Sequence, residues 1–399
     1  MKNSLFREGE ISLLFPFYLY YFIMSLSGLV FPFVMIYFLG LGFTFFQISI
    51  LFASFSVATF LFEIPTGSIA DAFSRKYSVI FGFLITSLAV FFLGYFSSFL
   101  MILISFTLFG IGNTFISGAE EAWVIDNLNH HKRKDLHQEF FIKSYSIQAF
   151  AGIFAPLIGA TVVKFYSIKP LWYIFSAGLL LCGLQLLIFG DEKYKPKRLK
   201  LIESFKETFS LSKKGLKYSL KNNNVKYLIF ATLFLAIVSL DFDYWQPFLT
   251  GLDMPVYLLG ILFSVLSLVG VINPFLTRHL QKYRIKNVLS SLILFRILIV
   301  IPVLFLYPGL VFLGMGIFIL GQGSWFLERP LIGPYFQKHL PKKIRATVTS
   351  LKSMSLQLGM GLGTLLFGFL ADVIGVQRLI PTISLFGLFG LYFLRKIKD

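Results

Sequence analysis

The stretch Lys143-Ser144-Tyr145-Ser146-Ile147-Gln148 has a counterpart 209 residues further along the chain, Lys352-Ser353-Met354-Ser355-Leu356-Gln357. The same offset pairs three glycines of the first half with three of the second: Gly42 with Gly251, Gly152 with Gly361, and Gly159 with Gly368. One six-residue match could arise by chance, but glycines kept in register along the chain indicate an internal duplication. We therefore expect two halves that share one architecture.

Composition indicates that both halves fold in lipid. The chain of 399 residues is 56% hydrophobic and only 14% charged, with a mean hydropathy of +0.78. A soluble domain usually has about 25% charged residues, so this chain lacks the polar surface that folding in water requires. A spanning helix needs about 20 mostly apolar residues. Twelve runs meet this requirement: 11–39, 45–70, 77–96, 99–125, 140–164, 170–189, 226–250, 256–277, 287–306, 309–335, 346–371 and 376–394.

Twelve spans in two sets of six predict an all-α polytopic membrane protein built from two pseudo-symmetric six-helix bundles. We expect an N-terminal bundle over residues 1–189 and a C-terminal bundle over residues 226–399. Residues 190–225 are the one long hydrophilic segment and are expected to be a cytoplasmic linker. Apolar residues recur at helical spacing among its lysines, which predicts an amphipathic helix on the inner membrane face near residues 199–209.

The net charge of +17 is distributed asymmetrically along the chain. Thirty-one of the 36 Lys and Arg residues lie in segments that the predicted topology assigns to one side of the membrane. The exceptions are Lys164, Lys169 and Arg378 on the other side, and Arg296 and Arg329 within spans. This positive-inside pattern predicts that both termini lie on the cytoplasmic side of the cell membrane. The basic inner surface suits anionic lipid headgroups, and no nucleic-acid partner is expected.

The most specific motif lies between the second and third spans: Gly67-Ser68-Ile69-Ala70-Asp71-Ala72-Phe73-Ser74-Arg75-Lys76. It resembles the signature of the major facilitator superfamily, roughly G-x-x-x-D-x-x-G-R-K, with Ser74 in place of the second glycine. The resemblance covers essentially the whole chain. It implies a secondary transporter that works by alternating access, with a conformational latch formed by Gly67, Asp71, Arg75, Lys76 and Asp126.

Physical reasons support these latch residues. A glycine at position 67 allows close approach of a neighbouring helix. The guanidinium of Arg75 can hold a carboxylate bidentately, and Asp126 at the end of the fourth span looks like its partner.

Two further segments are similar to drug-efflux members of that family: Ser117-Gly118-Ala119-Glu120-Glu121-Ala122-Trp123-Val124-Ile125-Asp126 and Ala155-Pro156-Leu157-Ile158-Gly159-Ala160. In the second segment, Pro156 and Gly159 match the antiporter pattern G-P-x-x-G-G, whereas Ala155 and Ala160 depart from it. The resemblance implies proton-coupled efflux of amphipathic small molecules. Uptake of a metabolite or nutrient by proton symport is an alternative, and so is a non-transporting sensor or scaffold. The sequence has no nucleophile–base or metal constellation that points to an enzyme.

Ionisable residues inside the spans are the candidates for proton coupling, because a charge in the bilayer is costly. These candidates are Asp241, Asp243, Glu120, Glu121, Glu63, Glu328 and Arg329. On a continuous helix Asp241 and Asp243 point about 200° apart, and we favour Asp241. Two structural alternatives remain open. Glu120, Glu328 and Arg329 can form a static ion-pair network, and Arg296 can either extend its charged end toward the membrane surface or have a local partner.

Polar and aromatic residues on the spans expected to line a central cavity complete the candidate site: Tyr18, Tyr21, Asn113, Gln148, Tyr244, Trp245, Gln246, Trp325 and Gln357. An aromatic wall with few hydrogen-bonding groups suits amphipathic or cationic organic molecules. We expect a small-molecule substrate, protons and membrane lipids as partners of a monomeric chain. No metal or cofactor is expected, because adjacent cations oppose metal binding by the histidines at 129–139 and Cys182 is the single cysteine.

Overall fold

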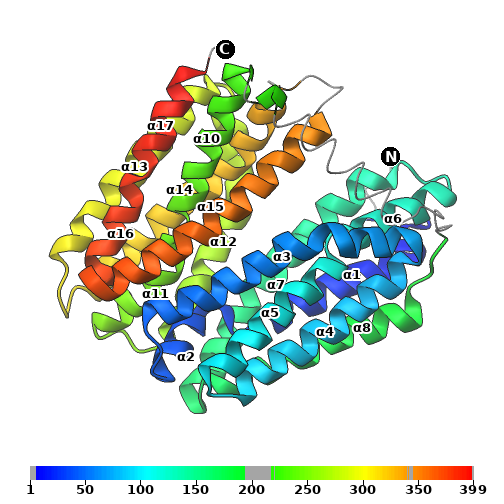
Figure 1. Ribbon diagram of the computed structural model, residues 1–399, viewed down its shortest axis with the longest axis horizontal. Coiled ribbons are helices and arrows are strands. Elements are labelled where there is room, and N and C mark those ends of the chain that lie inside the picture. The colour runs from blue at the N-terminus through cyan, green and yellow to red at the C-terminus, as the bar shows by residue number, and fades with distance from the viewer. Residues whose placement is uncertain (1–5, 194–216, 220, 339, 341–344, 398–399) are drawn as a thin grey trace. The chain divides into compact units, whose positions relative to one another are not determined.

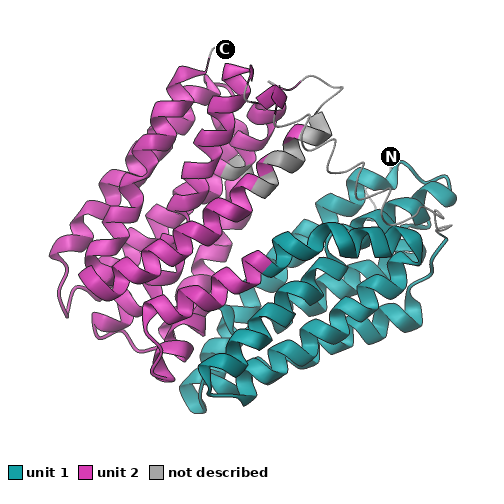
Figure 2. Ribbon diagram, in the orientation of Figure 1, with its two compact units in different colours: residues 1–31, 58–206 teal, residues 32–57, 207–399 magenta. Residues whose placement is uncertain are grey.

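The computed structural model describes residues 6–193, 217–219, 221–338, 340 and 345–397, and every regular element in these ranges is a helix (Figure 1). The amphipathic helix predicted near residues 199–209 lies outside the described residues. The chain divides into two compact units, shown in Figure 2. Unit 1 comprises residues 1–31 and 58–206, and unit 2 comprises residues 32–57 and 207–399.

Eleven helices in the described part of the chain are long and apolar enough to cross a membrane. They correspond to eleven of the twelve predicted spans. The eighth predicted span corresponds to α12 (Leu258–Leu280), whose described apolar part, Leu258–Asn273, is shorter. The prediction of an all-α polytopic membrane protein is therefore confirmed.

Unit 1 contains the second part of α3 (Phe45–Ala72) and six further helices: α1 (Glu10–Ser27), α4 (Arg75–Tyr95), α5 (Phe99–Ile116), α6 (Ala119–His130), α7 (Leu136–Phe165) and α8 (Lys169–Phe189). Helix α4 packs against α5 and α8, while α1 packs against α7 and α8. A Cβ atom at Gly82 of α4 would lie 2.8 Å from the carbonyl oxygen of Gly112 on α5. Only glycine permits an approach this close.

The fourth predicted span is broken between α5 and α6. Gly118 has a φ of 72°, a left-handed conformation that glycine adopts at little cost. A new helix begins at Ala119, so Glu120 and Glu121 lie in its first turn. The helix dipole favours acidic side chains at that end.

Unit 2 contains the first part of α3 and the following elements: α2 (Val34–Gly40), α10 (Asn223–Val238), α11 (Asp241–Gly251), α12, α13 (Ile285–Val300), η2 (Ile301–Phe305), α14 (Val311–Lys338), α15 (Arg345–Ile374), α16 (Val376–Leu385) and α17 (Gly387–Lys396). A short 3-10 turn, η1 (Phe31–Phe33), precedes α2. The buried core of unit 2 includes Leu228 of α10, Ile293 of α13 and Leu331 of α14.

The seventh predicted span is also broken, because α10 ends at Val238 and α11 begins at Asp241. The break precedes Pro247, which lies inside α11. It releases the carbonyl group of Val238 from the helical hydrogen-bond pattern. It also brings Asp241 and Asp243 into the first turn of α11.

Contacts within unit 2 explain why residues 32–57 belong to it. The carboxylate of Asp372, near the end of α15, accepts hydrogen bonds from the backbone N–H groups of Phe45 and Phe46, each at 2.9 Å. The backbone N–H of Met35 donates to Oε1 of Gln246 at 3.0 Å. One turn before Asp372, a Cβ atom at Gly368 would lie 2.8 Å from the carbonyl oxygen of Phe45. Helix α15 thus packs closely on the start of α3.

Candidate transport site

A cavity of about 550 Å³ lies within unit 2. Sites for small molecules usually have volumes of about 300–1,000 Å³. Helices α3, α10, α14 and α15 supply its walls. Three predicted site residues line this cavity, namely Trp325, Glu328 and Gln357. Further lining residues include Ser56, Thr232, Lys352, Leu356 and Met360.

Glu328 is the acidic residue of this cavity. Its side chain is 3% exposed, although it lies on the cavity wall. Its Oε1 atom has no hydrogen-bond partner among the described residues. When the carboxylate is ionised, its Oε1 atom loses water without gaining a described donor, which is energetically costly. The charge state of Glu328 therefore affects the free energy of enclosing this cavity.

A buried ion pair between α11 and α13 lies next to Glu328. Nη2 of Arg296 is 2.7 Å from Oδ1 of Asp241, and both side chains are almost fully buried. The same nitrogen donates at 3.3 Å to the carbonyl oxygen of Val238, the group released by the break between α10 and α11. Gln322 and Trp245 donate to the two oxygens of Asp241 at 3.2 and 3.4 Å. Asp241 is thus surrounded by donors.

Glu328 connects this ion pair with the cavity. A second void, of about 10 Å³, is lined by both Arg296 and Glu328. The guanidinium of Arg296 therefore faces one acid that it binds directly, Asp241, and a second acid across a small gap. Arg296 is the local partner of Asp241, one of the two roles considered for it from the sequence.

Asp243 lies apart from these groups. Together with Tyr244, Ser49 and Phe45 it lines a void of about 10 Å³. The two aspartates of α11 thus face different surroundings, as expected from their spacing on a helix. Asp241 pairs with Arg296, whereas Asp243 lies beside the start of α3.

Lys352 of α15 supplies the basic group of the cavity. Its Nζ atom lies 4.4 Å from the centre of the buried Phe336 ring. No carboxylate lies within salt-bridge distance of Lys352 in the part of the chain that the structure describes. The cavity therefore presents an acid and a base that do not neutralise each other through a direct ion pair.

Glu120 occupies a separate position in unit 1. Its two carboxylate oxygens accept hydrogen bonds from the hydroxyl group of Tyr21 at 2.9 and 3.0 Å, and its side chain is buried. The expected ion-pair network of Glu120, Glu328 and Arg329 stays a prediction, since the side chain of Arg329 is not among those described. Within the described residues, the partner of Glu120 is a tyrosine hydroxyl.

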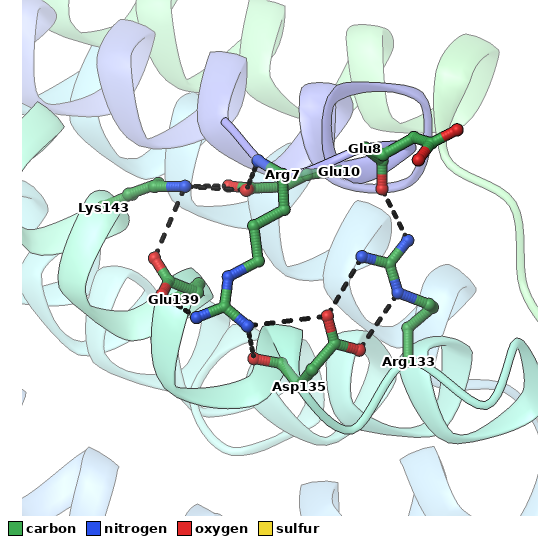
Figure 3. A network of polar contacts seen from close by, with 7 residues as sticks. All are labelled: Arg7, Glu8, Glu10, Arg133, Asp135, Glu139 and Lys143. Atoms are coloured by element: carbon green, nitrogen blue, oxygen red, sulfur yellow. Dashed lines mark hydrogen bonds and ion pairs between the residues drawn. The ribbon is translucent and has the colours of Figure 1, made fainter. Parts of the chain in front are cut away.

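A charged network joins α1 and α7 at one end of unit 1 (Figure 3). Nζ of Lys143 lies 2.6 and 2.7 Å from the two carboxylate oxygens of the fully buried Glu10. Glu10 also accepts a hydrogen bond from the hydroxyl of Tyr18. The exposed part of the network pairs Arg133 with Asp135 at 3.0 Å. Hydrogen bonding to the Arg133 guanidinium lowers the pKa of the Asp135 carboxyl below its usual value.

The predicted partners of the latch arginine are present in the structure. The guanidinium of Arg75 forms an ion pair with Asp126 and a second one, at 3.1 Å, with Asp71. Nζ of Lys76 donates to the carbonyl oxygens of Leu187 and Gly190 at the end of α8. Arg75, Asp126 and Glu121 line a cavity of about 420 Å³ at this end of unit 1.

The latch role expected for Gly67 stays a prediction. A Cβ atom at this position would meet no described atom within 4 Å.

Sequence reasoning missed Glu192, which follows α8. Its carboxylate accepts hydrogen bonds from the backbone N–H groups of Arg75 and Lys76 at 2.7 and 3.1 Å and from the hydroxyl of Ser74. It thus binds the free N–H groups at the start of α4. Ser74, which replaces the glycine of the family signature, caps this helix by accepting from the N–H of Tyr77. An acid just after a span was the available signal.

Several predicted residues do not reach the cavity of unit 2. Gln246 is buried and bonded to the backbone of Met35, and Tyr244 and Trp245 are buried beside the two aspartates. Glu63 is exposed on α3. Asn113 and Gln148 are half-buried on α5 and α7, and neither belongs to the lining described above.

These features define a class of protein, a polytopic α-helical membrane protein with a ligand-sized cavity and buried ionisable groups in its spans. The chain belongs to the Major Facilitator Superfamily, whose sequence profile matches residues 17–364. It is accordingly a multi-pass membrane transporter of a small molecule rather than an enzyme. The drug-antiporter subtype stays a prediction.

Two curated relatives cover nearly the whole chain. The uncharacterised MFS-type transporter YxaM of Bacillus subtilis (strain 168) is 22% identical over 386 residues, which is 93% of each chain. The uncharacterised MFS-type transporter MJ1560 of Methanocaldococcus jannaschii is 21% identical over 379 residues, covering 90% of this chain and 91% of the relative.

Solved transporter structures share the fold. The nucleoside transporter NupG superposes with a TM-score of 0.76 at 16% identity, covering 98% of this chain and all of NupG. A bacterial homolog of the human lysosomal transporter Spinster, in an inward-facing and occupied conformation, gives a TM-score of 0.74 at 15% identity, covering 96% of this chain and 95% of the homolog. At such identities the likeness establishes the fold alone.

Proposed function

We propose that this chain is a proton-coupled secondary transporter of an amphipathic small molecule, and that Glu328 is the group that binds the coupling proton. One observation supports this proposal above the others. The carboxyl group of Glu328 lies on the wall of the 550 Å³ cavity, is 3% exposed and leaves Oε1 without a described hydrogen-bond partner. A proton on Glu328 would remove the cost of enclosing an ionised carboxylate.

Asp241, the residue favoured from the sequence, is less suited to this role. Its charge is balanced by Arg296 and its oxygens receive hydrogen bonds from Gln322 and Trp245. This buried pair is expected to hold α11 against α13 through a transport cycle. Glu328 lacks this support and faces the cavity, so its protonation can change with access to water.

Alternating access supplies the transport step. In this cycle, the substrate and the proton bind while the cavity is open to one side and leave when it is open to the other. The ion pairs of Arg75 with Asp126 and Asp71 would stabilise one of the two states, as the resemblance to the family implies. The export direction expected from Pro156 and Gly159 rests on the sequence, and uptake by symport uses the same parts.

Purified protein in proteoliposomes provides the test. A melting-temperature screen over drug and metabolite panels identifies a ligand, and a pH-sensitive dye inside the vesicles then records ligand-dependent proton flux under an imposed pH gradient. Glu328→Gln should abolish this flux, while Glu328→Asp, which keeps a titratable carboxyl group, should retain part of it.

Asp253→Asn is the matched control. Asp253 is exposed between α11 and α12 and has a φ of 67°, a conformation that asparagine also tolerates. The ligand-dependent proton flux of the Asp253→Asn protein should equal that of the wild type. Full ligand-dependent proton flux in a folded Glu328→Gln protein would refute the assignment of the coupling residue.

A further inference from the structure

Lys352 and Lys143 occupy the same position in the two halves of the duplication, yet their surroundings differ. Lys143 opens the first copy of the repeated six-residue segment and Lys352 opens the second. In unit 1, Lys143 is neutralised by the buried carboxylate of Glu10, at 2.6 and 2.7 Å, with Glu139 at 3.5 Å (Figure 3). The fold can therefore give this lysine an internal counter-ion.

The described part of the second half lacks that counter-ion. At the offset of 209 residues, Glu10 corresponds to Ser219, and the sequence has no Asp or Glu between Glu207 and Asp241. The hydroxyl of Ser219 is buried and has no hydrogen-bond partner among the described residues. The described contact of the Lys352 ammonium is with the ring of Phe336 at 4.4 Å, which holds a cation without neutralising it.

Lys352 instead faces the cavity. It shares the 550 Å³ space with the apolar or aromatic side chains of Trp325, Leu356 and Met360. A half-buried ammonium that has no counter-ion among the described residues is costly unless a ligand supplies the opposite charge. The side chains around it also offer an apolar surface to the rest of such a ligand.

We propose that the cavity of unit 2 binds an amphipathic organic anion, whose carboxylate or similar anionic group pairs with Nζ of Lys352 while its apolar part packs against Trp325, Leu356 and Met360. That this ligand is the transported substrate rests on the function proposed above. The sequence suggested amphipathic or cationic substrates. The position of Lys352 narrows this range, because an ammonium in the cavity repels cations.

The charges around the cavity also indicate whether the proton and the substrate move in the same direction or in opposite directions. Arg296 of α13 and Asp241 of α11 cancel each other, while α10 contributes the uncharged Thr232. Lys352 of α15 and ionised Glu328 of α14 carry opposite charges. Among the described side chains that line the cavity, protonation of Glu328 leaves one positive charge, and binding of an anion neutralises it. The proton and the anion therefore favour each other's binding, as symport requires, whereas antiport requires them to compete.

The test is a charge series, in which ligands share one apolar carbon skeleton and differ only in the charge of their polar group. A panel of aryl and alkyl carboxylates, including 3-phenylpropionate, is compared with the amines and alcohols of the same carbon skeleton. Dissociation constants are measured by calorimetry on purified protein in detergent, without a pH gradient. Wild-type protein should prefer the carboxylates. Lys352→Gln should weaken carboxylate binding at least about tenfold, the effect of losing one charged hydrogen bond, and leave alcohol binding unchanged.

Two further variants separate charge recognition from folding. Lys352→Arg keeps the cation and should restore most of the preference for carboxylates. Lys338→Gln removes an exposed lysine at the end of α14 and should leave every dissociation constant unchanged. Equal or tighter binding of the amines in wild-type protein, the absence of any carboxylate binding, or an unchanged preference in folded Lys352→Gln would each overturn the proposal.

This experiment is independent of the proton-coupling assignment. A Glu328→Gln protein that keeps its driven flux would contradict the role of Glu328 without affecting the charge series. A wild-type protein that prefers amines would contradict the anion site even if Glu328 carries the proton. Carboxylate binding should also be accompanied by proton uptake in weakly buffered solution, and this uptake should be absent in Glu328→Gln.

Discussion

Removing one partner of the Asp241–Arg296 ion pair should destabilise the protein strongly, and by unequal amounts. Arg296 is 2% exposed and Asp241 is fully buried, with 2.7 Å between Nη2 and Oδ1. Breaking a buried ion pair costs about 3–5 kcal/mol, because the remaining charge is left uncompensated. Arg296→Met should lie at the upper end, since Asp241 and Glu328 then remain as two neighbouring acids. Asp241→Asn should cost about 3 kcal/mol or less, because Glu328 can supply a replacement charge to Arg296.

Unfolding titrations in mixed micelles, followed by circular dichroism, give the free energies of unfolding for wild type, both single variants and the double variant Asp241→Asn/Arg296→Met. The double variant should be more stable than the sum of the single changes implies, by at least about 1.5 kcal/mol. The exposed Arg278→Met, at the end of α12, is the control and should change stability by less than about 0.5 kcal/mol. Additive single effects, or an Arg296→Met protein more stable than Asp241→Asn, would refute this account.

Two further predictions concern packing and acid stability. Gly368→Ala should lower the free energy of unfolding by about 1–3 kcal/mol, because its Cβ would lie 2.8 Å from the Phe45 carbonyl oxygen. The same titration should find Gly316→Ala, where a Cβ meets nothing within 4 Å, neutral or slightly stabilising. Because hydrogen bonding to Arg133 lowers the pKa of Asp135, this pair stabilises the protein above an unfolded-state pKa of about 3.9 and loses its effect as pH falls through the lower folded value. Melting temperatures between about pH 2 and 7 should fall less steeply on the acid side in Asp135→Asn, and identical acid limbs would contradict this.

Much of the fold could be predicted because lipid imposes a simple rule on sequence. A spanning helix must be apolar for about 20 residues, so hydropathy alone locates the spans. The ion pair of Arg75 with Asp126 could also be predicted, because Arg75 lies in a family motif and Asp126 lies at the end of the span expected to be next to it. These features depend on local sequence or on a motif, and neither requires knowledge of how the helices are rotated.

The partners of the buried charges could not be predicted in this way. Arg296 and Asp241 are separated by 55 residues, and their meeting depends on the rotation of α13 and on the break after Val238. A lone arginine in an apolar run indicates that a partner is needed, but the sequence does not show which acid is that partner. Gln246 was assigned to the cavity for a similar reason, and helix rotation directs it to the backbone of Met35 instead.

The duplication itself carries information about function that neither half carries alone. At the offset of 209 residues, three buried charges of the second half of the sequence correspond to uncharged residues of the first half: Asp241 to Pro32, Arg296 to Ser87, and Glu328 to Ala119. Conversely, Glu10 neutralises Lys143 in the first half, and the counterpart of Glu10 in the second half is the uncharged Ser219. Residues that maintain a shared architecture should be alike in both halves, since both must satisfy the same packing. A charge that is buried in one half only has a desolvation cost that the other half avoids. Such a charge is therefore best explained by selection for transport rather than by selection for folding.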